Sequence, residues 1–396
     1  MFERRHLKTL GAILVASSLS NIITIVMITS EVPSKTSNQR ALQGYHCDDA
    51  PSEEIKGHRH CNVYDVTNEC SEWFPCILMN TTESPSICVY TMNRDNVISA
   101  WLAKRGIWEQ HVIFKILDIL RSNKEYGFID LGANLGTHTI PAASLKRKVI
   151  AVEPYYDNVL RLHKSVRMNN LEGYVTVLLN AIYDKRTNIS FIENKNSNMG
   201  STQVRETVQY EISPEKIKKH EIVETIYVDD LLEVVDFKAG VMKIDIENCE
   251  CEAFEEASEL FNTVSLAYVF MEWPGEWMGY VEWNRVQGKC DLKNIVQFFT
   301  SRGYEPFRTL DDTQLPVQTW KIWAPQQYNK EVDIYWKLNP AKAKTHKHVV
   351  NEVDDALEDV NDDSYVNSED IEESAEDGVY IAEETESAET VDVEQL

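Results

Sequence analysis

The chain has 396 residues and a formal net charge of -25, and 19 of its acidic residues lie in residues 351–396, a segment without Lys or Arg. Affinity for nucleic acids comes from clustered basic side chains, so this composition argues against a nucleic-acid partner. The length allows one large or two modest domains, and a hydrophobic fraction of 43% is ordinary for a globular protein.

Residues 1–30 predict a membrane segment. Arg4, Arg5 and Lys8 precede an uncharged stretch from Thr9 to Ser30. That stretch is long enough to cross the hydrocarbon core of a bilayer as a helix. The basic residues before it predict a single-pass type II protein, whose remainder is lumenal or extracellular. A signal peptide cleaved near Ser20, giving a secreted protein, is the alternative.

Residues 31–100 form a linker and cysteine-rich prefix. Five of the eight cysteines lie at positions 47, 61, 70, 76 and 88, and the others at 249, 251 and 290. An even number of cysteines in an exported chain indicates disulfides, although the pairing is open. If all are paired, at least one bridge joins the prefix to the following domain. Asn80 and Asn188 head glycosylation motifs. The run GHRHC at 57–61 lacks a second ligand pair, so we expect no metal site.

Residues 101–340 predict one α/β domain. The apolar positions between Ile107 and Leu120 follow one face of a helix. Short apolar runs typical of parallel strands follow at Phe128–Leu131, Val149–Val152, Val175–Leu179, Val241–Ile244 and Leu266–Met271. We expect a hairpin from 189–192 and 203–208, and a closing antiparallel pair from 319–324 and 332–338. The alternation predicts a doubly wound, mostly parallel, seven-stranded sheet of the Rossmann-like type.

A glycine turn between the first two strands is the strongest functional signal. Asp130 ends the first strand, the turn carries Gly132, Asn134 and Gly136, and Glu153 ends the second strand. In open α/β sheets ligands bind at these strand ends, where an acid can accept ribose hydroxyls. The spacing D-x-G-x-x-x-G differs from the dinucleotide pattern G-x-G-x-x-G. It therefore favours a nucleoside cofactor without phosphates, such as S-adenosylmethionine, over NAD.

Residues 105–275 resemble the FkbM-type S-adenosylmethionine-dependent methyltransferases. The resemblance is carried by FIDLGANLGTHTI at 128–140, VIAVEPYYDN at 149–158, VTVLLNAIYD at 175–184 and VMKIDIENCECEAFEEA at 241–257. It implies that the cofactor is lined by Asp130, Gly132, Asn134, Gly136 and Glu153, with Asn180 and Ala181 near the adenine. The chain departs from the family pattern at Glu247–Glu250, where an acid-glycine-alanine-acid run is usual.

Acids at the ends of the fourth and fifth strands are the candidates for the acceptor side. Methyl transfer to an alcohol requires loss of a proton, which a positioned carboxylate can accept. We expect Asp245 first in this role, with Glu272 as the second catalytic candidate; Glu247 has the same placement. The alternative for Asp245 is a structural ion pair with Lys243, because the two side chains share one face of a strand.

Residues 341–396 form a tail too acidic and too poor in apolar residues to fold, and its protein partner is unknown.

The leading hypothesis is a membrane-tethered methyltransferase that uses S-adenosylmethionine on an oxygen of a glycan, lipid or small molecule. The alternative is a catalytically degenerate methyltransferase fold that acts as an extracellular binding protein.

Overall fold

The computed structural model describes residues 58–70, 72–191, 199, 204–207, 212–246, 249–273, 292–323 and 332–343. The predicted anchor at 1–30 and the acidic residues from 344 onward lie outside this set. Among the described residues, no helix combines the length and the apolar character that a bilayer crossing requires.

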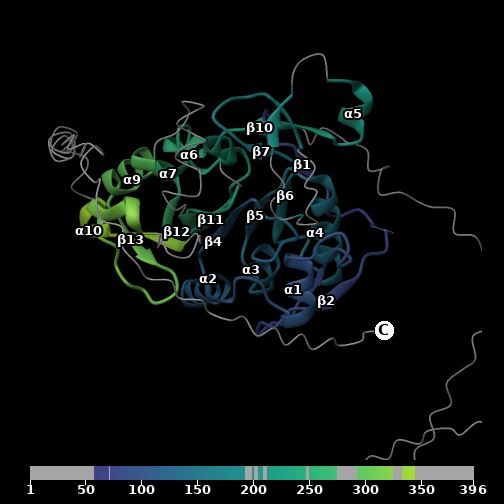
Figure 1. The fold of residues 1–396 in the computed structure, drawn as a ribbon, viewed down its shortest axis with the longest axis horizontal. Coiled ribbons are helices and arrows are strands. Elements are labelled where there is room, and N and C mark those ends of the chain that lie inside the picture. Colours follow the sequence, from purple (N-terminus) through teal and green to yellow (C-terminus); the bar gives the residue numbers. More distant parts are fainter. Residues whose placement is uncertain are drawn as a thin grey trace, which may run out of the picture.

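An eight-stranded sheet forms the centre of the fold (Figure 1). The five strands β6, β5, β4, β11 and β12 run parallel, as continuous apolar runs buried on both faces predict. In sheet order the strands are β1 (Val63–Tyr64), β6 (Val175–Leu178), β5 (Val149–Val152), β4 (Gly127–Leu131), β11 (Ala239–Ile244), β12 (Ser265–Trp273), β14 (Val332–Leu338) and β13 (Tyr304–Arg308).

Two sequence predictions about this sheet are wrong. It has eight strands instead of seven, because β1 from the prefix pairs antiparallel with β6. The closing pair is β13 with β14, and residues 317–322 form the 3-10 helix η4 (Val317–Ile322). Trp320 and Trp323 of that region pack against the ring of Trp273, so their apolar character reflects core packing and not a strand.

Helices cover both faces of the sheet. On one face, α2 (Gln110–Ser122), α3 (Thr139–Ser144) and α4 (Tyr156–Met168) bury apolar side chains against β4, β5 and β6. The helix α1 (Ile98–Arg105) packs outside α2 through Leu102. The opposite face is covered by η3 (Val228–Glu233), α6 (Glu250–Ala253), α7 (Ser258–Thr263), α9 (Leu292–Ser301) and η4, with α10 (Pro340–Ala343) following β14.

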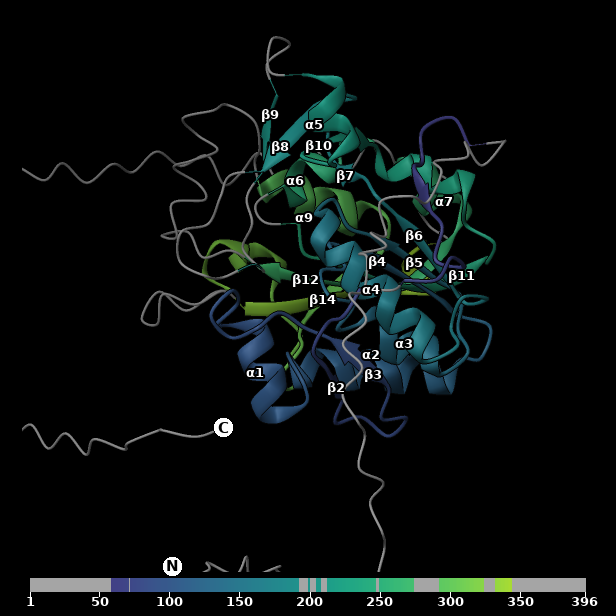
Figure 2. The same ribbon diagram turned by 90° about the vertical axis from the view of Figure 1, so that its right-hand side faces the viewer.

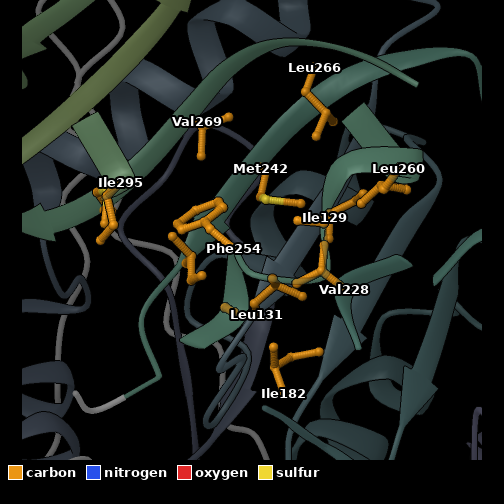
Figure 3. Packing of buried hydrophobic residues seen from close by; sticks show 14 of the residues in the cluster. Ile129, Leu131, Ile182, Val228, Met242, Phe254, Leu260, Leu266, Val269 and Ile295 are labelled. Carbon is orange, nitrogen blue, oxygen red and sulfur yellow. The ribbon is translucent and has the colours of Figure 1, made fainter. Parts of the chain in front are cut away.

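The larger core lies on that second face. Figure 3 shows Met242 of β11 among Ile129, Leu131 and Val269 of the neighbouring strands, with the ring of Phe254 beside it. These side chains are at most 6% exposed, which makes the central strands the most buried part of the described chain.

A second, four-stranded sheet projects from the domain (Figure 2). The predicted hairpin is confirmed, because β8 (Asn188–Phe191) and β9 (Val204–Glu206) pair antiparallel. Two strands that the sequence analysis did not identify complete the sheet: β7 (Ala181–Ile182) and β10 (Ile222–Ile226), with α5 (Pro214–Lys218) before the latter.

The prefix folds onto the domain. Its two-stranded sheet, β2 (Cys76–Leu78) and β3 (Ser86–Cys88), carries a disulfide between Cys76 and Cys88. Cys251 is also disulfide-bonded. The thiol of Cys61 instead donates to the carbonyl oxygen of Asp230 at 3.3 Å, so the eight cysteines are not all in disulfides.

We expect Met242→Ala to lower the free energy of unfolding by about 2–5 kcal/mol, because it leaves a cavity between central strands. Met168→Ala is the matched control, since that side chain is 47% exposed. Chemical denaturation monitored by circular dichroism measures both. Equal effects of the two substitutions would contradict the assignment of the core.

Candidate functional site

A cavity lies at the carboxyl ends of β4, β5, β6 and β11. It combines the glycine turn after β4, the segment after β5, the start of the small sheet and the end of β11. Its walls are formed by Gly132, Asn134, Val152, Glu153, Pro154, Tyr155, Asn158, Asn180, Ala181, Ile182, Phe191, Met199, Asp245, Ile246 and Cys249. Six of the sequence-predicted site residues are therefore brought together: Gly132, Asn134, Glu153, Asn180, Ala181 and Asp245.

The glycine turn needs its two glycines for different reasons. Gly132 has φ +81°, and a Cβ atom there would lie 1.8 Å from the carbonyl oxygen of Asp245. The turn therefore lies directly against the end of β11. Gly136 has φ +88° and faces Leu162 of α4, which a Cβ would approach to 2.5 Å. Gly136 thus serves helix packing and does not line the cavity.

Glu153 is an acid of the cavity wall whose carboxylate is held by three hydrogen bonds. Its Oε2 accepts the backbone N–H of Asn134 at 2.7 Å, and its Oε1 accepts the N–H of Tyr155 at 2.9 Å and the side-chain amide of Asn158 at 3.1 Å. Burial raises the pKa of Glu153 to about 7, although these three donors favour its ionised form. A fixed carboxylate with lone pairs left over can accept hydroxyl groups from a ligand.

Another part of the cavity wall is formed by Asn180 and by two aromatic rings. The side-chain amide of Asn180 donates to the Glu224 carbonyl at 3.2 Å, and its Oδ1 accepts the N–H of Asn62 at 2.7 Å, so this side chain ties the prefix to the small sheet. The rings of Tyr155 and Phe191 meet edge to face at 5.1 Å. Apolar and aromatic walls beside a pre-oriented acid suit a nucleoside, whose base is flat and whose sugar carries hydroxyls.

The sequence analysis did not predict the other nine lining residues, which include Tyr155, Asn158, Phe191 and Met199. The position of Tyr155, two residues after the strand-end acid, is a signal that could have placed it. Phe191 and Met199 come from the insertion, and only the fold brings them to the cavity.

Asp130 lies below the cavity and not on its wall. The residue is 1% exposed and accepts the hydroxyl of Thr139 at 2.5 Å. On the neighbouring strand its partner is Lys243. Burial raises the pKa of Asp130 to about 6, and the ammonium of Lys243 partly offsets that rise.

Asp245 forms the structural ion pair that the sequence analysis held as the alternative. Its Oδ2 lies 2.7 Å from Nζ of Lys243, whose side chain is only 6% exposed. Asp245 also lines the cavity, so the ion pair and a contact with a ligand are compatible. Glu247 lies outside the described residues.

A row of ionisable side chains continues along the same face of the sheet. Alternation along the strands places Glu272 of β12 on the face of Phe270, opposite Asp333 of β14. Glu272 does not line the cavity. Three residues of the covering helices meet this row. Glu109 and His111 lie at the start of α2, and His138 precedes α3.

The arrangement has a donor-side half and an acceptor-side half. Glu153, Asn180 and the aromatic wall can hold a nucleoside, and the acids around Lys243 can receive a proton.

Among the described residues, one His/Asp/Glu group is close enough to hold a metal ion: His60, Asp230 and Glu233. However, both carboxylate oxygens of Asp230 are bonded to Arg186, at 2.6 and 2.7 Å, so that group is better explained by the ion pair.

Comparisons with known proteins address the fold and the family. Residues 130–306 match the profile of the methyltransferase FkbM domain. No curated protein matches the chain. Every described lining residue of the cavity falls within the matched segment, whereas Glu109 and Asp333 lie outside it.

Three solved structures illustrate the remote structural similarity. The precorrin-6y C5,15-methyltransferase of Geobacter metallireducens is 11% identical, with 59% of this chain and 90% of that one aligned and a TM-score of 0.30. The magnesium protoporphyrin IX methyltransferase of Synechocystis, solved with bound SAH, is 9% identical over 58% and 82%, with a TM-score of 0.31. A putative O-methyltransferase of Klebsiella pneumoniae is 11% identical over 59% and 82%, with a TM-score of 0.28.

We expect Gly132→Ala to destabilise the protein by at least about 2 kcal/mol, because the new Cβ collides with a backbone carbonyl and the φ angle is unfavourable for alanine. Gly173→Ala is the control, since nothing lies within 4 Å of a Cβ there. Thermal unfolding of the two variants provides the comparison. A Gly132→Ala protein as stable as the control would show that the turn is not packed against β11.

Proposed function

We propose that the protein uses S-adenosylmethionine to methylate an oxygen atom of a glycan, lipid or small molecule, because residues 130–306 match the methyltransferase FkbM domain. The observation that carries the proposal is the carboxylate of Glu153, fixed by three hydrogen-bond donors at the edge of a cavity with an aromatic wall. Such a carboxylate can accept the ribose hydroxyls, and an aromatic wall suits the flat adenine ring.

The residues of the cavity divide the work of holding such a cofactor. Glu153 accepts the ribose hydroxyls, and Asn180 and Ala181 border the adenine. Gly132 and Asn134 present the backbone of the turn to the amino-acid end. When bound, S-adenosylmethionine supplies a methyl carbon activated by its sulfonium charge. The protein then has to align an acceptor oxygen with that carbon and exclude water.

The acids in the row around Lys243 are the groups that can accept a proton from the methyl acceptor. Asp245 lines the cavity, and its Oδ2 is held at 2.7 Å from the ammonium of Lys243. Glu272 lies on β12, opposite Asp333 of β14, and is the second candidate. A row rich in carboxylates would disfavour acceptors that are themselves phosphates or carboxylates. It therefore supports a neutral hydroxyl acceptor.

We place the reaction in the lumen of the secretory pathway, with residues 1–30 as a type II anchor. The disulfide between Cys76 and Cys88 supports this location, because disulfides persist in oxidising compartments. Asn80, which heads a glycosylation motif, is exposed. A second candidate function, an extracellular binding protein without catalysis, is favoured by the departure from the family pattern at Glu247–Glu250.

Calorimetry of the purified protein with S-adenosylmethionine and S-adenosylhomocysteine tests the proposal. We expect micromolar binding of both, lost in Glu153→Ala because the ribose loses its acceptor; a Kd in that range corresponds to roughly -8 kcal/mol. Label transfer from methyl-tritiated donor to secreted glycan and lipid fractions then distinguishes an enzyme from a binding protein. The absence of any heat with wild-type protein would overturn the proposal, and tighter binding of NAD would indicate a dehydrogenase.

Cofactor affinity should rise with pH through neutrality. Burial raises the pKa of Glu153 to about 7, and the ionised form is the one whose two oxygens both accept, as a pair of ribose hydroxyls requires. The carboxyl must therefore lose its proton on binding, so we expect roughly tenfold weaker binding of S-adenosylhomocysteine at about pH 6 than at about pH 8. Calorimetry at the two pH values measures this. A Kd that is independent of pH would show that the bound ligand does not engage the carboxylate.

A further inference from the structure

Glu109, at the start of α2, lies beyond the cavity wall and outside the family-matched segment. Its backbone has φ 45° and ψ 51°, a left-handed conformation that is uncommon for a residue with a long side chain. Strained backbone of this kind persists only where the surrounding structure enforces it, and it concentrates at functional sites.

The side chain of Glu109 is 14% exposed, and its Oε2 is a buried atom without a hydrogen-bond partner. Its Oε1 accepts the indole N–H of Trp108 at 2.8 Å. Its Oε2 lies 3.4 Å from Nε2 of His138 and 3.6 Å from Nζ of Lys243, yet neither Oε2 nor that ring nitrogen has a hydrogen-bond partner. Buried polar atoms are nearly always bonded, so two adjacent unpartnered atoms indicate a place for a further hydrogen-bonding group.

The position of this pair relative to the cavity is set by Lys243. Its ammonium is shared between Glu109 and Asp245, and Asp245 lines the cavity. One ammonium group thus connects the Glu109 carboxylate to an acid that lines the proposed cofactor site. His138 is only 5% exposed and the side chain of Glu109 is 14% exposed, so both groups are largely shielded from solvent.

We propose that Glu109 is a catalytic residue of the acceptor side, and that the acceptor hydroxyl docks beside the pair formed by its Oε2 and Nε2 of His138, in contact with both atoms. This rests on the proposed methyltransferase function. The acceptor O–H bond breaks and its proton passes to Oε2 of Glu109. The same acceptor oxygen forms a bond to the methyl carbon while the sulfur–methyl bond breaks, and that electron pair stays on sulfur as neutral S-adenosylhomocysteine. Glu109, being partly exposed, then returns its proton to solvent.

Glu109 suits the role of base better than Asp245. Oδ2 of Asp245 is hydrogen-bonded to Lys243 at 2.7 Å, whereas Oε2 of Glu109 lies 3.6 Å from that ammonium and makes no hydrogen bond, so Glu109 has an oxygen available to take a proton. Burial raises the pKa of Glu109 to about 7, near the value at which a general base works best in neutral solution. The charged or titratable groups that face it are Lys243, Asp245, Asp333, His111 and His138.

His138 contributes an orienting group and no charge. Burial lowers the pKa of His138 well below its ordinary value, and nearby Lys243 lowers it further, so the ring is neutral at pH 7. The Thr137 hydroxyl lies 3.2 Å from Nδ1. In the tautomer with hydrogen on Nε2, the ring donates to the acceptor oxygen while Glu109 takes its proton.

The first test needs no acceptor. Infrared difference spectra of the full chain, between about pH 5 and about pH 9, report protonated carboxyl groups that titrate near neutrality. Glu153 and Glu250 also have pKa values of about 7, so the Glu109 signal is the difference between wild type and Glu109→Gln. We expect that difference to contain one carboxyl group with a midpoint near 7. A difference spectrum without any titrating carboxyl overturns the proposal.

The second test uses binding and transfer. S-adenosylhomocysteine should bind Glu109→Gln as it binds wild type, since Glu109 does not line the cavity. Methyl transfer from tritiated donor to the labelled fraction should fall by roughly 10² to 10⁴-fold. Transfer at the wild-type rate overturns the proposal. Failure of wild type to bind S-adenosylhomocysteine instead defeats the proposed function, which keeps the two failures distinct.

Asp118→Asn is the matched control on the same helix. Its carboxylate is 75% exposed in the side chain and pairs with Arg121 at 2.9 Å. We expect wild-type binding, transfer and infrared titration from this variant. Loss of transfer in both variants would assign the effect to disturbance of α2, and the proposal would then fall.

Discussion

The buried ammonium of Lys243 is the interaction on which the acceptor side depends. A cation in the middle of a central strand is costly unless carboxylates surround it. Burial alone would lower the pKa of Lys243, but Asp245, Glu109 and Asp130 together raise it well above its ordinary value. These carboxylates come from two strands and a helix terminus, so one positive charge fixes three chain segments relative to one another. Without it, they would repel one another in a poorly solvated space.

Gly132 connects this charged cluster to the donor side. Because it has no Cβ, the turn that carries Asn134 lies against the carbonyl oxygen of Asp245. The N–H of Asn134 in turn holds Glu153. The proposed cofactor contact and the acid at the end of β11 are therefore parts of one packed unit. A change in the turn is transmitted to both halves, and the separation between a bound cofactor and an acceptor is set by backbone contacts and not by mobile side chains.

Much of this fold was accessible from sequence because its parallel strands are short, continuous apolar runs. The glycine turn and the acid at Glu153 also follow from local pattern. What could not be predicted is long-range. The two residues of β1 are too few to show periodicity, and the tryptophans of η4 have the same apolar character as a strand. Glu109 belongs to no recognisable motif. It becomes a candidate only because folding brings it close to Lys243, which is far along the chain. Asp130 and Gly136 were expected on the cavity wall, but one supports the strand end and the other packs a helix.

The pairing of β1 with β6 gives the cysteine-rich prefix a protective role. A parallel sheet that ends in an uncovered strand presents unsatisfied N–H and C=O groups to other molecules. Here Val63 and Tyr64 occupy that border, and the N–H of Leu179 is bonded to the carbonyl of Asn62 just beyond it. A fragment that began at residue 101 would retain the matched segment but expose the flank of β6. Such a fragment would tend to self-associate edge to edge. The stretch before residue 101 therefore helps to keep the domain soluble by covering the edge of β6.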